Sequence, residues 1–360
     1  MSNLKERHLF PGANTSRGFY SCFDYIINKE TANRVFCIKG GPGTGKSHLM
    51  KEIGKYFQNK GYTIEYHHCS SDDASLDAVV IKDLKIALMD GTAPHIVDPV
   101  YPIAIDEVLN MGDAMNQDII SKNKQEIIEL SKIISSKFKR AYSFFAAAKS
   151  IHEDWCKLNA EAMDSYKIDT ITESLKEEIF INQKTGYGDE RHIFGTSFTP
   201  NGIITFVKDL SSEFNNKFVL KGGPGFGKSH ILKAIGKTAQ KKGYFVEYLH
   251  DPFIPDRIEH VFIPELSTCI LTENEISQTA FSGKVYNIED FCKANVLAKN
   301  KSDIEYDSKV FYDLIKKGLS YLTEAHALHD DLEKFYIDAI DFDVCNTIYD
   351  NVISKIEKYE

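Results

Sequence analysis

Hydrophobic and polar residues follow two different patterns along this chain. In each half, short apolar runs come first and longer stretches with a helical spacing of apolar residues follow. The run Arg34–Ile38 predicts a buried strand, and the residues after position 45 predict an amphipathic helix. The apolar face of that helix comprises Leu49, Met50, Ile53 and Phe57. Strand and helix are separated by the glycine-rich segment Lys39–His48.

The same reasoning places the other elements of the two glycine-containing regions. Further strands are predicted at Phe218–Leu220, Tyr62–His67, Tyr244–Leu249 and Leu84–Met89. The turns Ser16–Gly18 and Pro200–Gly202 lead into segments that we expect to be helical, Phe19–Asn28 and Ile203–Ser211. Parallel sheets flanked by helices are expected, with ligands at the carboxyl ends of the strands.

Long helices are predicted after each of these regions. Neither glycine nor proline occurs from Asp113 to Thr185. The stretch from Ile288 to Glu360 has no proline and a single glycine, Gly318. The apolar residues with helical spacing are Ile127, Leu130, Ile134, Phe138, Tyr142 and Phe145 in the first stretch, and Val310, Leu314, Leu322, Leu332, Phe335 and Ala339 in the second. Each stretch is therefore expected to form a long amphipathic helix or a helical hairpin.

The chain contains an internal repeat. The segment Lys39–Cys69 is identical to Lys221–Asp251 at 20 of 31 positions, 182 residues apart. Glu6–Phe10 recurs as Glu190–Phe194. We therefore expect an α/β protein of two tandem modules, each followed by a long-helix appendage. The predicted boundaries are 1–112 and 186–287 for the modules, and 113–185 and 288–360 for the helical appendages.

Composition narrows the class of protein. The chain has 360 residues, a hydrophobic fraction of 42% and a net charge of −9, and no run approaches the length of a membrane span. An acidic chain is a poor match for a broad nucleic-acid-binding surface, so nucleic acid is not an expected partner. The first residues, Met1–Arg7, do not resemble a secretory signal, and the seven cysteines form no C-x-x-C pair. A cytoplasmic location is expected.

The glycine-rich segments carry the chemistry. Each fits G-x-x-x-x-G-K-[ST], in which backbone N–H groups and the start of a helix surround phosphate oxygens. We expect Lys46 and Lys228 to bind the β- and γ-phosphates, and Ser47 and Ser229 to bind Mg²⁺. The predicted nucleotide-binding residues are Gly41, Pro42, Gly43, Thr44, Gly45, Lys46, Ser47 and His48, and Gly223, Pro224, Gly225, Phe226, Gly227, Lys228, Ser229 and His230.

One carboxylate is expected beside the first loop. Asp90 ends an apolar strand, where an aspartate orients Mg²⁺, so Lys46 and Asp90 are the predicted catalytic pair. The alternative is an aspartate that only begins the Asp90–Gly91 turn. In the second module Thr272 stands at this position, with Glu273 one residue late and Asp251 at the end of the preceding strand. The second site is therefore expected to bind phosphate but to hydrolyse poorly.

Other polar residues have both a functional and an ordinary interpretation. Thr92 or His95 is a candidate contact for the γ-phosphate, and Asp72, Asp73 or Asp98 a candidate general base. Arg7 and Arg191 recur between the modules as candidate arginine fingers or as surface salt bridges. His48 and His230 are candidates for contacts to the nucleotide or for packing and surface positions. His152 and His329 are expected to be solvated or to make polar contacts between helices, since metal binding would need further ligands that the sequence does not identify.

Together, Gly40–Ser47, Gly222–Ser229 and Asp90 resemble the P-loop NTPase superfamily. The sequence Gly-Pro-Gly-Thr-Gly-Lys-Ser is similar to the loops of AAA-type ATPases. The sequence Gly-Lys-Ser-His-Leu is similar to the loops of replication-initiator and helicase-loader ATPases. Tandem loops, with Asp90–His95 in the first half and a helical segment after each module, resemble a poorly characterised bacterial family of ATPase or nucleotide-kinase-like proteins. The resemblance implies binding of ATP, with GTP also possible, and of Mg²⁺.

Three functions follow as expectations. The first is Mg²⁺-dependent ATP hydrolysis, mainly at the first site, with the second site degenerate and regulatory. The second is phosphoryl transfer to a small-molecule or nucleotide hydroxyl, because Gly91 replaces the hydrolytic glutamate that usually follows the aspartate. The third is a non-hydrolysing switch in which nucleotide sets the arrangement of the modules and their helical appendages for a protein partner.

Overall fold

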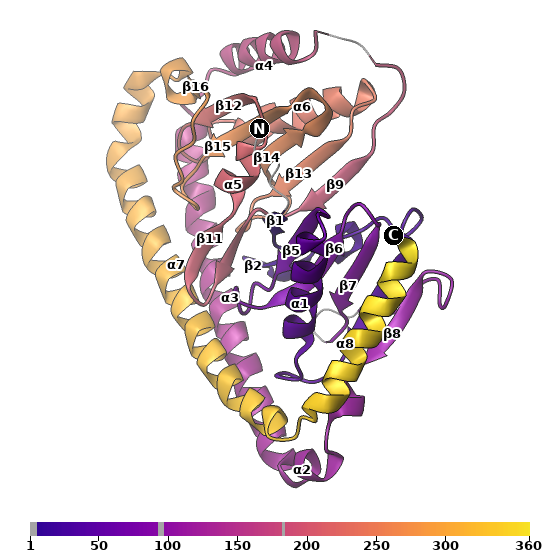
Figure 1. Ribbon diagram of the computed structural model, residues 1–360. Coiled ribbons are helices and arrows are strands. Elements are labelled where there is room, and N and C mark those ends of the chain that lie inside the picture. The colour runs from indigo at the N-terminus through magenta and orange to yellow at the C-terminus, as the bar shows by residue number, and fades with distance from the viewer. Residues whose placement is uncertain (1–5, 93–96, 182–183) are drawn as a thin grey trace.

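The computed structural model describes residues 6–92, 97–181 and 184–360, and it is a mixed α/β protein (Figure 1). Among these residues, strands form two six-stranded sheets, in the orders β1-β5-β6-β7-β4-β8 and β9-β13-β14-β15-β12-β16. The two orders correspond strand for strand, so the sequence repeat is also a structural repeat. We call the segment from β1 to η2 the first module and that from β9 to η4 the second module.

The modules have closely matching elements. The first contains β1 (Glu6–Leu9), β2 (Gly12–Thr15), β3 (Gly18–Ser21), η1 (Phe23–Tyr25), β4 (Arg34–Lys39), α1 (Lys46–Asn59), β5 (Ile64–His68), β6 (Leu76–Ile81), β7 (Ile86–Asp90), β8 (Asp106–Asn110) and η2 (Met111–Ala114). The second contains β9 (Glu190–Ile193), β10 (Thr196–Thr199), β11 (Gly202–Thr205), α5 (Val207–Ser212), β12 (Asn216–Lys221), α6 (Lys228–Lys241), β13 (Val246–His250), β14 (Ile258–Ile263), η3 (Pro264–Leu266), β15 (Thr268–Glu273), β16 (Lys284–Asn287) and η4 (Ile288–Phe291). The remaining helices are α2 (Gln117–Lys122), α3 (Lys124–Ala160), α4 (Ser165–Ile179), α7 (Ala294–Ile337), α8 (Phe342–Ile356) and η5 (Glu357–Tyr359).

The strands predicted around the glycine-rich segments are confirmed as β4, β5 and β7, and as β12 and β13. The predicted face of α1 is also confirmed, because Leu49, Met50, Ile53 and Phe57 are all buried against the first sheet. The order of strand, glycine-rich loop and helix therefore occurs twice.

The expectation of purely parallel sheets is wrong. Strand β6 runs antiparallel to both β5 and β7, and β14 does the same between β13 and β15. Only four residues separate β6 from β7, and so short a connection joins antiparallel strands, whereas a parallel pair needs a long crossover. Lys85 and Ser267, in the two equivalent turns, have positive φ angles of 52° and 46°.

The expected helices after the two turns are also wrong for most of their length. Residues Gly18–Ser21 and Gly202–Thr205 are instead the second strands of the hairpins β2–β3 and β10–β11. The φ angles of Gly18 and Gly202, +99° and +105°, suit a tight hairpin turn. Only the short helices η1 and α5 follow.

The long helices are confirmed, and the two longest pair with each other. Helices α3 and α7 lie side by side and run in opposite directions (Figure 1). Phe145 of α3 packs against the face of α7 at Gly318, where a Cβ atom would collide with the ring. Lys137 binds Glu324 at 2.5 Å on the exposed side of the same pair. We call α3 and α7 the helix pair.

The helix that follows each member of the pair packs on the other half of the chain. Helix α4 follows α3 and covers the second sheet, with Ile171 and Leu175 in its core. Helix α8 follows α7 and returns to the first sheet, where Val352 and Ile356 are buried beside α1. We call the first module with α2, α3 and α4 the first repeat, and the second module with α7 and α8 the second repeat. The two repeats therefore exchange their terminal helices, and each completes the other's core.

A four-residue charge cluster joins the two modules. The guanidinium of Arg7 lies 2.6 Å from Glu65 and 2.8 Å from Glu247, and that of Arg191 lies 2.8 Å from Glu65 and 3.1 Å from Glu247. All four side chains are at least 88% buried, with exposures of 12% or less. Nearby, the backbones of Phe10 and Phe194 exchange two hydrogen bonds. Buried and paired here, the two arginines are neither surface salt bridges nor arginine fingers at the glycine-rich loops.

Burial alone would raise the pKa of Glu247, but the charges of Arg7 and Arg191 lower it to about 2. The same balance, with Arg191 foremost among the opposing charges, holds the pKa of Glu65 well below its usual value. Both carboxylates therefore stay ionised at neutral pH, and the cluster has two positive and two negative groups.

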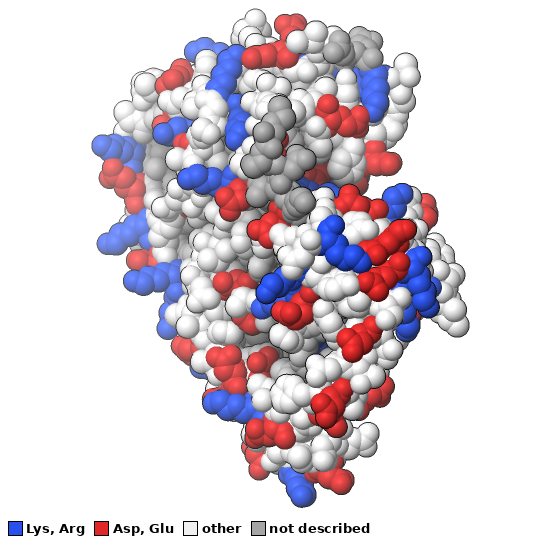
Figure 2. All heavy atoms as spheres, viewed as in Figure 1, with Lys and Arg blue, Asp and Glu red and all other residues white. Residues whose placement is uncertain are grey.

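No helix in the described parts of the chain is both long and apolar enough to cross a membrane. The face shown in Figure 2 carries positive and negative side chains interspersed with one another.

We predict that Glu247→Gln lowers the free energy of unfolding by about 3–5 kcal/mol at pH 7, because it leaves two buried guanidinium groups to share the single carboxylate of Glu65. The pKa of Glu247 is lowered on folding from 4.5 to about 2. Its stabilising effect is therefore complete above pH 4.5 and is lost as the pH falls toward 2. Denaturant titrations of both proteins between these pH values should converge as the pH falls.

The matched control is Glu213→Gln, because Glu213 lies 3.7 Å from Arg7 but is 29% exposed. We expect it to change stability by less than about 1 kcal/mol. A Glu247→Gln effect as small as that of the control, or one that grows as the pH falls, would contradict the role given to the cluster.

Candidate functional site

The first glycine-rich loop turns from β4 into α1 on two residues with positive φ. Gly43 and Gly45 have φ angles of +65° and +81°, and Gly45 is the residue that precedes the first turn of α1. No side chain in the described part of the chain caps this helix. Backbone N–H groups at the start of α1 are therefore available to an anion, which the helix dipole also favours.

The lysine, serine and aspartate predicted for this site lie around the loop. The Nζ atom of Lys46 donates to the carbonyl oxygens of Gly40 at 3.0 Å and Gly41 at 2.7 Å, and lies 3.6 Å from Oδ2 of Asp90. The hydroxyl oxygen of Ser47 accepts the N–H of Leu76 at 3.0 Å. An ammonium and a carboxylate thus flank one loop, which suits a phosphate with a divalent cation.

The contacts of Asp90 agree with both roles considered for it, a carboxylate beside the loop and the first residue of a turn. Its side chain faces Lys46, and its Oδ1 atom also accepts the N–H of Thr92 at 2.8 Å in the following turn. The Thr92 hydroxyl donates to the carbonyl oxygen of Gly40 at 2.9 Å, so this residue touches the loop. His95 lies outside the described residues.

The candidate general bases each have another partner. Asp98 lies 2.8 Å from Lys39 and is 69% exposed. Asp72 accepts from Ser75, and Asp73 accepts from Asn201 at 3.0 Å. None of these contacts brings a carboxylate to Lys46, so the described residues do not identify a base.

The second loop repeats this backbone. Gly225 and Gly227 have φ angles of +85° and +82°, and Lys228 donates to the carbonyl oxygens of Gly222 and Gly223. Burial lowers the pKa of Lys228. The N–H of Gly223 donates to a carboxylate oxygen of Glu289 at 3.3 Å, so one loop amide already binds a negatively charged group.

The remaining predicted loop residues divide into core and surface positions. Thr44 and Phe226, which occupy the same place in the two loops, are both buried. The Thr44 hydroxyl donates to the carbonyl oxygen of Gly41 at 2.9 Å. His48 and His230 are exposed on the first turns of α1 and α6.

Carboxylates are arranged differently at the second loop. In the strand register Thr272 pairs with Leu220 as Asp90 pairs with Ile38, which confirms that a threonine replaces the aspartate. Glu273 lies 3.6 Å from Lys221, and Asp251 accepts the N–H groups of Phe253 and Ile254. Neither carboxylate thus takes the place of Asp90.

Glu275, which sequence reasoning missed, lies against the helix pair with its side chain 9% exposed. Its Oε1 atom lies 2.5 Å from Nε2 of His152. Burial would lower the pKa of His152, but hydrogen bonds with Cys156 and Glu275 raise it to about 9. Burial would raise the pKa of Glu275, but His152 and Lys228 lower it to about 2. The pair is therefore ionic at neutral pH.

Each glycine-rich loop is touched by the end of the long helix from the other repeat. A Cβ atom on Gly43 would lie 3.1 Å from the backbone oxygen of Glu333 on α7, and one on Gly41 would collide with the Tyr336 ring. At the second loop, Asn159 of α3 donates to the carbonyl oxygen of Pro224 at 2.8 Å. A Cβ atom on Gly225 would collide with the Cys156 carbonyl.

The short helix that ends each module lies on that module's own loop. Met111 of η2 approaches Gly40, and Ile288 and Glu289 of η4 approach Gly222. Both loops are therefore enclosed between the segment that leaves their own module and the helix that arrives from the other one.

These helix contacts could not be found from the repeat. The helical parts are related by an offset of 177 residues, from Ala148 to Ala325. This offset matches Cys156 with Glu333 and Asn159 with Tyr336, but the residue types differ in each pair. Nothing in the sequence indicates that these positions meet a loop in the other half.

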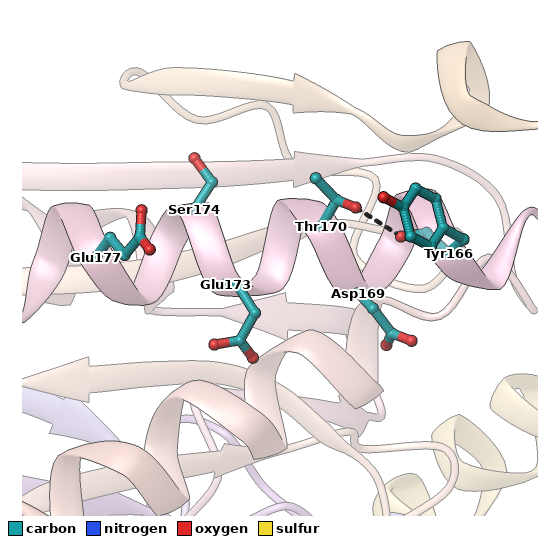
Figure 3. Close-up of a pocket in the computed structure, with 6 residues that line it drawn as sticks. All are labelled: Tyr166, Asp169, Thr170, Glu173, Ser174 and Glu177. Atoms are coloured by element: carbon teal, nitrogen blue, oxygen red, sulfur yellow. Dashed lines mark hydrogen bonds between the residues drawn. The ribbon is translucent and has the colours of Figure 1, made fainter.

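A groove elsewhere has the wrong chemistry for phosphate. It has a volume of about 430 Å³ and lies along the exposed side of α4, where Asp169, Glu173 and Glu177 supply three carboxylates (Figure 3). All of its lining residues come from this one helix, and they point to different sides of it (Figure 3). The groove contains no residue of either glycine-rich loop.

The residues at the first loop fit a phosphate group with its cation better than a cation alone. Among the described residues, no group of three or more His, Cys, Asp or Glu side chains could hold a metal ion. Ser47 and Asp90 provide two oxygen ligands, and Mg²⁺ commonly uses one or two protein ligands together with phosphate oxygens and water. The uncapped start of α1 and the lysine supply the matching sites for phosphate.

Comparison with known proteins gives one partial match. A family model described as Nephrocystin 3, N-terminal, matches residues 20–89. This range is less than half of the chain; it includes the first glycine-rich loop and ends one residue before Asp90. No curated protein matches the chain, and no solved structure matches it.

We predict that Gly225→Ala destabilises the protein more than Gly202→Ala does. Both glycines have positive φ, which costs alanine about 1–2 kcal/mol. A Cβ atom on Gly225 also collides with Cys156, whereas one on Gly202 has no neighbour within 4 Å. Denaturant titration should show an additional loss of about 1–3 kcal/mol for Gly225→Ala. Equal losses would show that α3 does not press on the second loop.

Proposed function

We propose that this chain is a P-loop protein that binds Mg-ATP at both glycine-rich loops and hydrolyses it mainly at the first. The observation that carries the proposal is the arrangement of Lys46 and Asp90, 3.6 Å apart beside an uncapped helix start. The second loop has an equivalent lysine, Lys228, but no aspartate in register, which supports a second site of different activity. The match to the Nephrocystin 3 N-terminal family model covers the first loop.

The residues of the first site have separable roles in this proposal. The ammonium of Lys46 exchanges the loop carbonyls for phosphate oxygens and stabilises the charge that develops during phosphoryl transfer. Amides of the loop and of the first turn of α1 orient the same oxygens. Ser47 and Asp90 would hold Mg²⁺, which when bound neutralises charge on the phosphates.

The helix contacts favour a second candidate, a nucleotide-dependent switch with little turnover. Glu333 and Tyr336 approach the first loop so closely that a change in the loop's conformation must be accommodated by α7. Nucleotide binding would then alter the packing of the helix pair, which is the surface we propose for a protein partner. Acceptor-dependent phosphoryl transfer is the third outcome that the assay below distinguishes.

We expect Lys46→Ala to reduce phosphate release from Mg-ATP by at least about a hundredfold, because it removes a principal positive group at the transferred phosphate. Lys228→Ala is the matched control, since each lysine is 9% exposed and bonded to its own loop, and it should retain most of the activity. Phosphate release with and without a metabolite pool measures this.

The outcomes separate the candidates. Release without an acceptor that is lost in Lys46→Ala supports hydrolysis, and ADP formation only with the metabolite pool supports phosphoryl transfer. Binding without turnover supports the switch. Equal loss of activity in the two variants would contradict the division of labour between the loops. Absence of any calorimetric signal with Mg-ATP or Mg-GTP would contradict the proposal as a whole.

A further inference from the structure

The two glycine-rich loops differ in the neighbouring strand that brings a carboxylate to them. At the first loop the carboxylate is Asp90, which ends β7 and lies 3.6 Å from Lys46. At the second loop Thr272 stands in that place, and its buried hydroxyl donates to the carbonyl oxygen of Glu259 at 2.9 Å. The carboxylate that reaches the second loop follows the strand on the other side, β16, and belongs to Glu289.

Glu289 occupies a position that is glycine in the first module. Strands β8 and β16 lie beside β4 and β12 and end at Asn110 and Asn287. In each module the side chain of this asparagine donates to the aspartate three residues later, at 2.7 Å and 2.8 Å. The short helices η2 and η4 are therefore equivalent, and Glu289 corresponds to Gly112.

The carboxylate of Glu289 binds the backbone of the second loop. Its Oε1 atom accepts the N–H of Gly223 at 3.3 Å, and its Cγ atom would lie 3.8 Å from a Cβ atom on Gly222. The side chain is exposed, so it can leave this amide for another partner at little cost in free energy. A negative charge is thus placed at the start of a loop whose amides and lysine favour anions.

A carboxylate in this position affects the two forms of a nucleotide in opposite ways. A metal-free triphosphate is a concentrated negative charge, which a neighbouring carboxylate repels. A divalent cation on the same phosphates neutralises part of that charge and is itself attracted to the carboxylate. Mg²⁺ is commonly bound by one or two carboxylates together with phosphate oxygens and water. The charge of Glu289 therefore favours the cation-bound form.

We infer that Glu289 makes the second loop selective for nucleotide that carries a divalent cation. This inference rests on the proposed function, since it assumes that the second loop binds a nucleoside triphosphate. The two sites would then obtain their carboxylates from opposite neighbours of the loop strand. Asp90 faces the lysine of its loop, whereas Glu289 contacts the loop backbone, and this difference is in keeping with binding that leads to little hydrolysis.

The test uses Lys46→Ala protein, in which only the second loop is intact. Calorimetric titration with ATP in Mg²⁺ and in EDTA gives two affinities, whose ratio measures the selectivity. We expect Glu289→Gln to weaken binding of Mg-ATP and to strengthen binding of metal-free ATP, so that the ratio falls by about tenfold or more. The matched control is Asp290→Asn, because Asp290 accepts from Asn287 rather than from the loop. It should change the ratio by less than about twofold.

A second variant, Glu289→Ala, removes the acceptor oxygen together with the charge and should lower the ratio as Glu289→Gln does. Since the side chain is exposed, both variants should unfold at the temperature of their Lys46→Ala parent. An unchanged ratio would overturn the inference. Equally stronger binding of both forms would also overturn it, because Glu289 would then only obstruct the loop.

Failure of the inference can be told from failure of the proposed function. If Lys228→Ala protein binds Mg-ATP and Lys46→Ala protein does not, the second loop takes no nucleotide and the inference alone fails. If neither protein binds Mg-ATP, the proposed function fails as well.

Discussion

The exchange of helices between the two repeats is the constraint on which the rest of this structure depends. Helix α8 is at the end of the second repeat but fills the core of the first sheet with Val352 and Ile356. Helix α4, which ends the first repeat, does the same for the second sheet. Since burial of apolar surface is the main source of stability, neither repeat holds a complete core without the other.

This exchange also determines where the long helices end. Because α3 must deliver α4 to the second sheet, its last turns pass the second glycine-rich loop; α7 passes the first loop for the same reason. Two backbone hydrogen bonds between the repeats, one near the start of α8 and one just before α7, stabilise this path. The backbone N–H of Asp341 donates to the carbonyl oxygen of Ala114 at 2.7 Å, and that of Lys293 donates to the carbonyl oxygen of Ala162 at 2.8 Å. Proximity of each loop to the opposite repeat is thus a consequence of how the cores are completed.

The charge cluster of Arg7, Arg191, Glu65 and Glu247 has a different role from the exchanged helices. Apolar packing between the sheets is tolerant of small rotations, whereas four buried charges are satisfied only when each guanidinium meets both carboxylates. The cluster therefore specifies one relative orientation of the modules. In that orientation the last turns of α7 lie against the first loop and the last turns of α3 lie against the second.

Local patterns in the sequence predicted local structure well. The strands before the loops, the face of α1 and the long helices could be predicted, because each depends on residues within one segment. The antiparallel strand β6 was missed because Leu76–Ile81 is buried along its whole length, although it includes Asp77, and because its direction depends on the turn after it. The hairpins at Gly18 and Gly202 were missed because a turn followed by apolar residues suits a strand as well as a helix.

The candidate site was predictable only where its residues lie in the loop. Lys46 and Asp90 are found together as expected from strand, loop and strand end. Asn159 and Tyr336 could not be found, because their contacts with the loops come from the path of the helix pair, not from any spacing in the chain. The pairing of Arg7 with Glu247, 240 residues apart, is likewise a property of the whole fold.

The central claim is that both modules and the helix pair form one cooperative unit, to which nucleotide at either loop is coupled. Scanning calorimetry of Lys228→Ala protein, which keeps only the first loop intact, tests it most directly. We predict a single unfolding transition with equal calorimetric and van't Hoff enthalpies, which Mg-ATP shifts upward as a whole. Two transitions, of which Mg-ATP moves only one, would contradict this account.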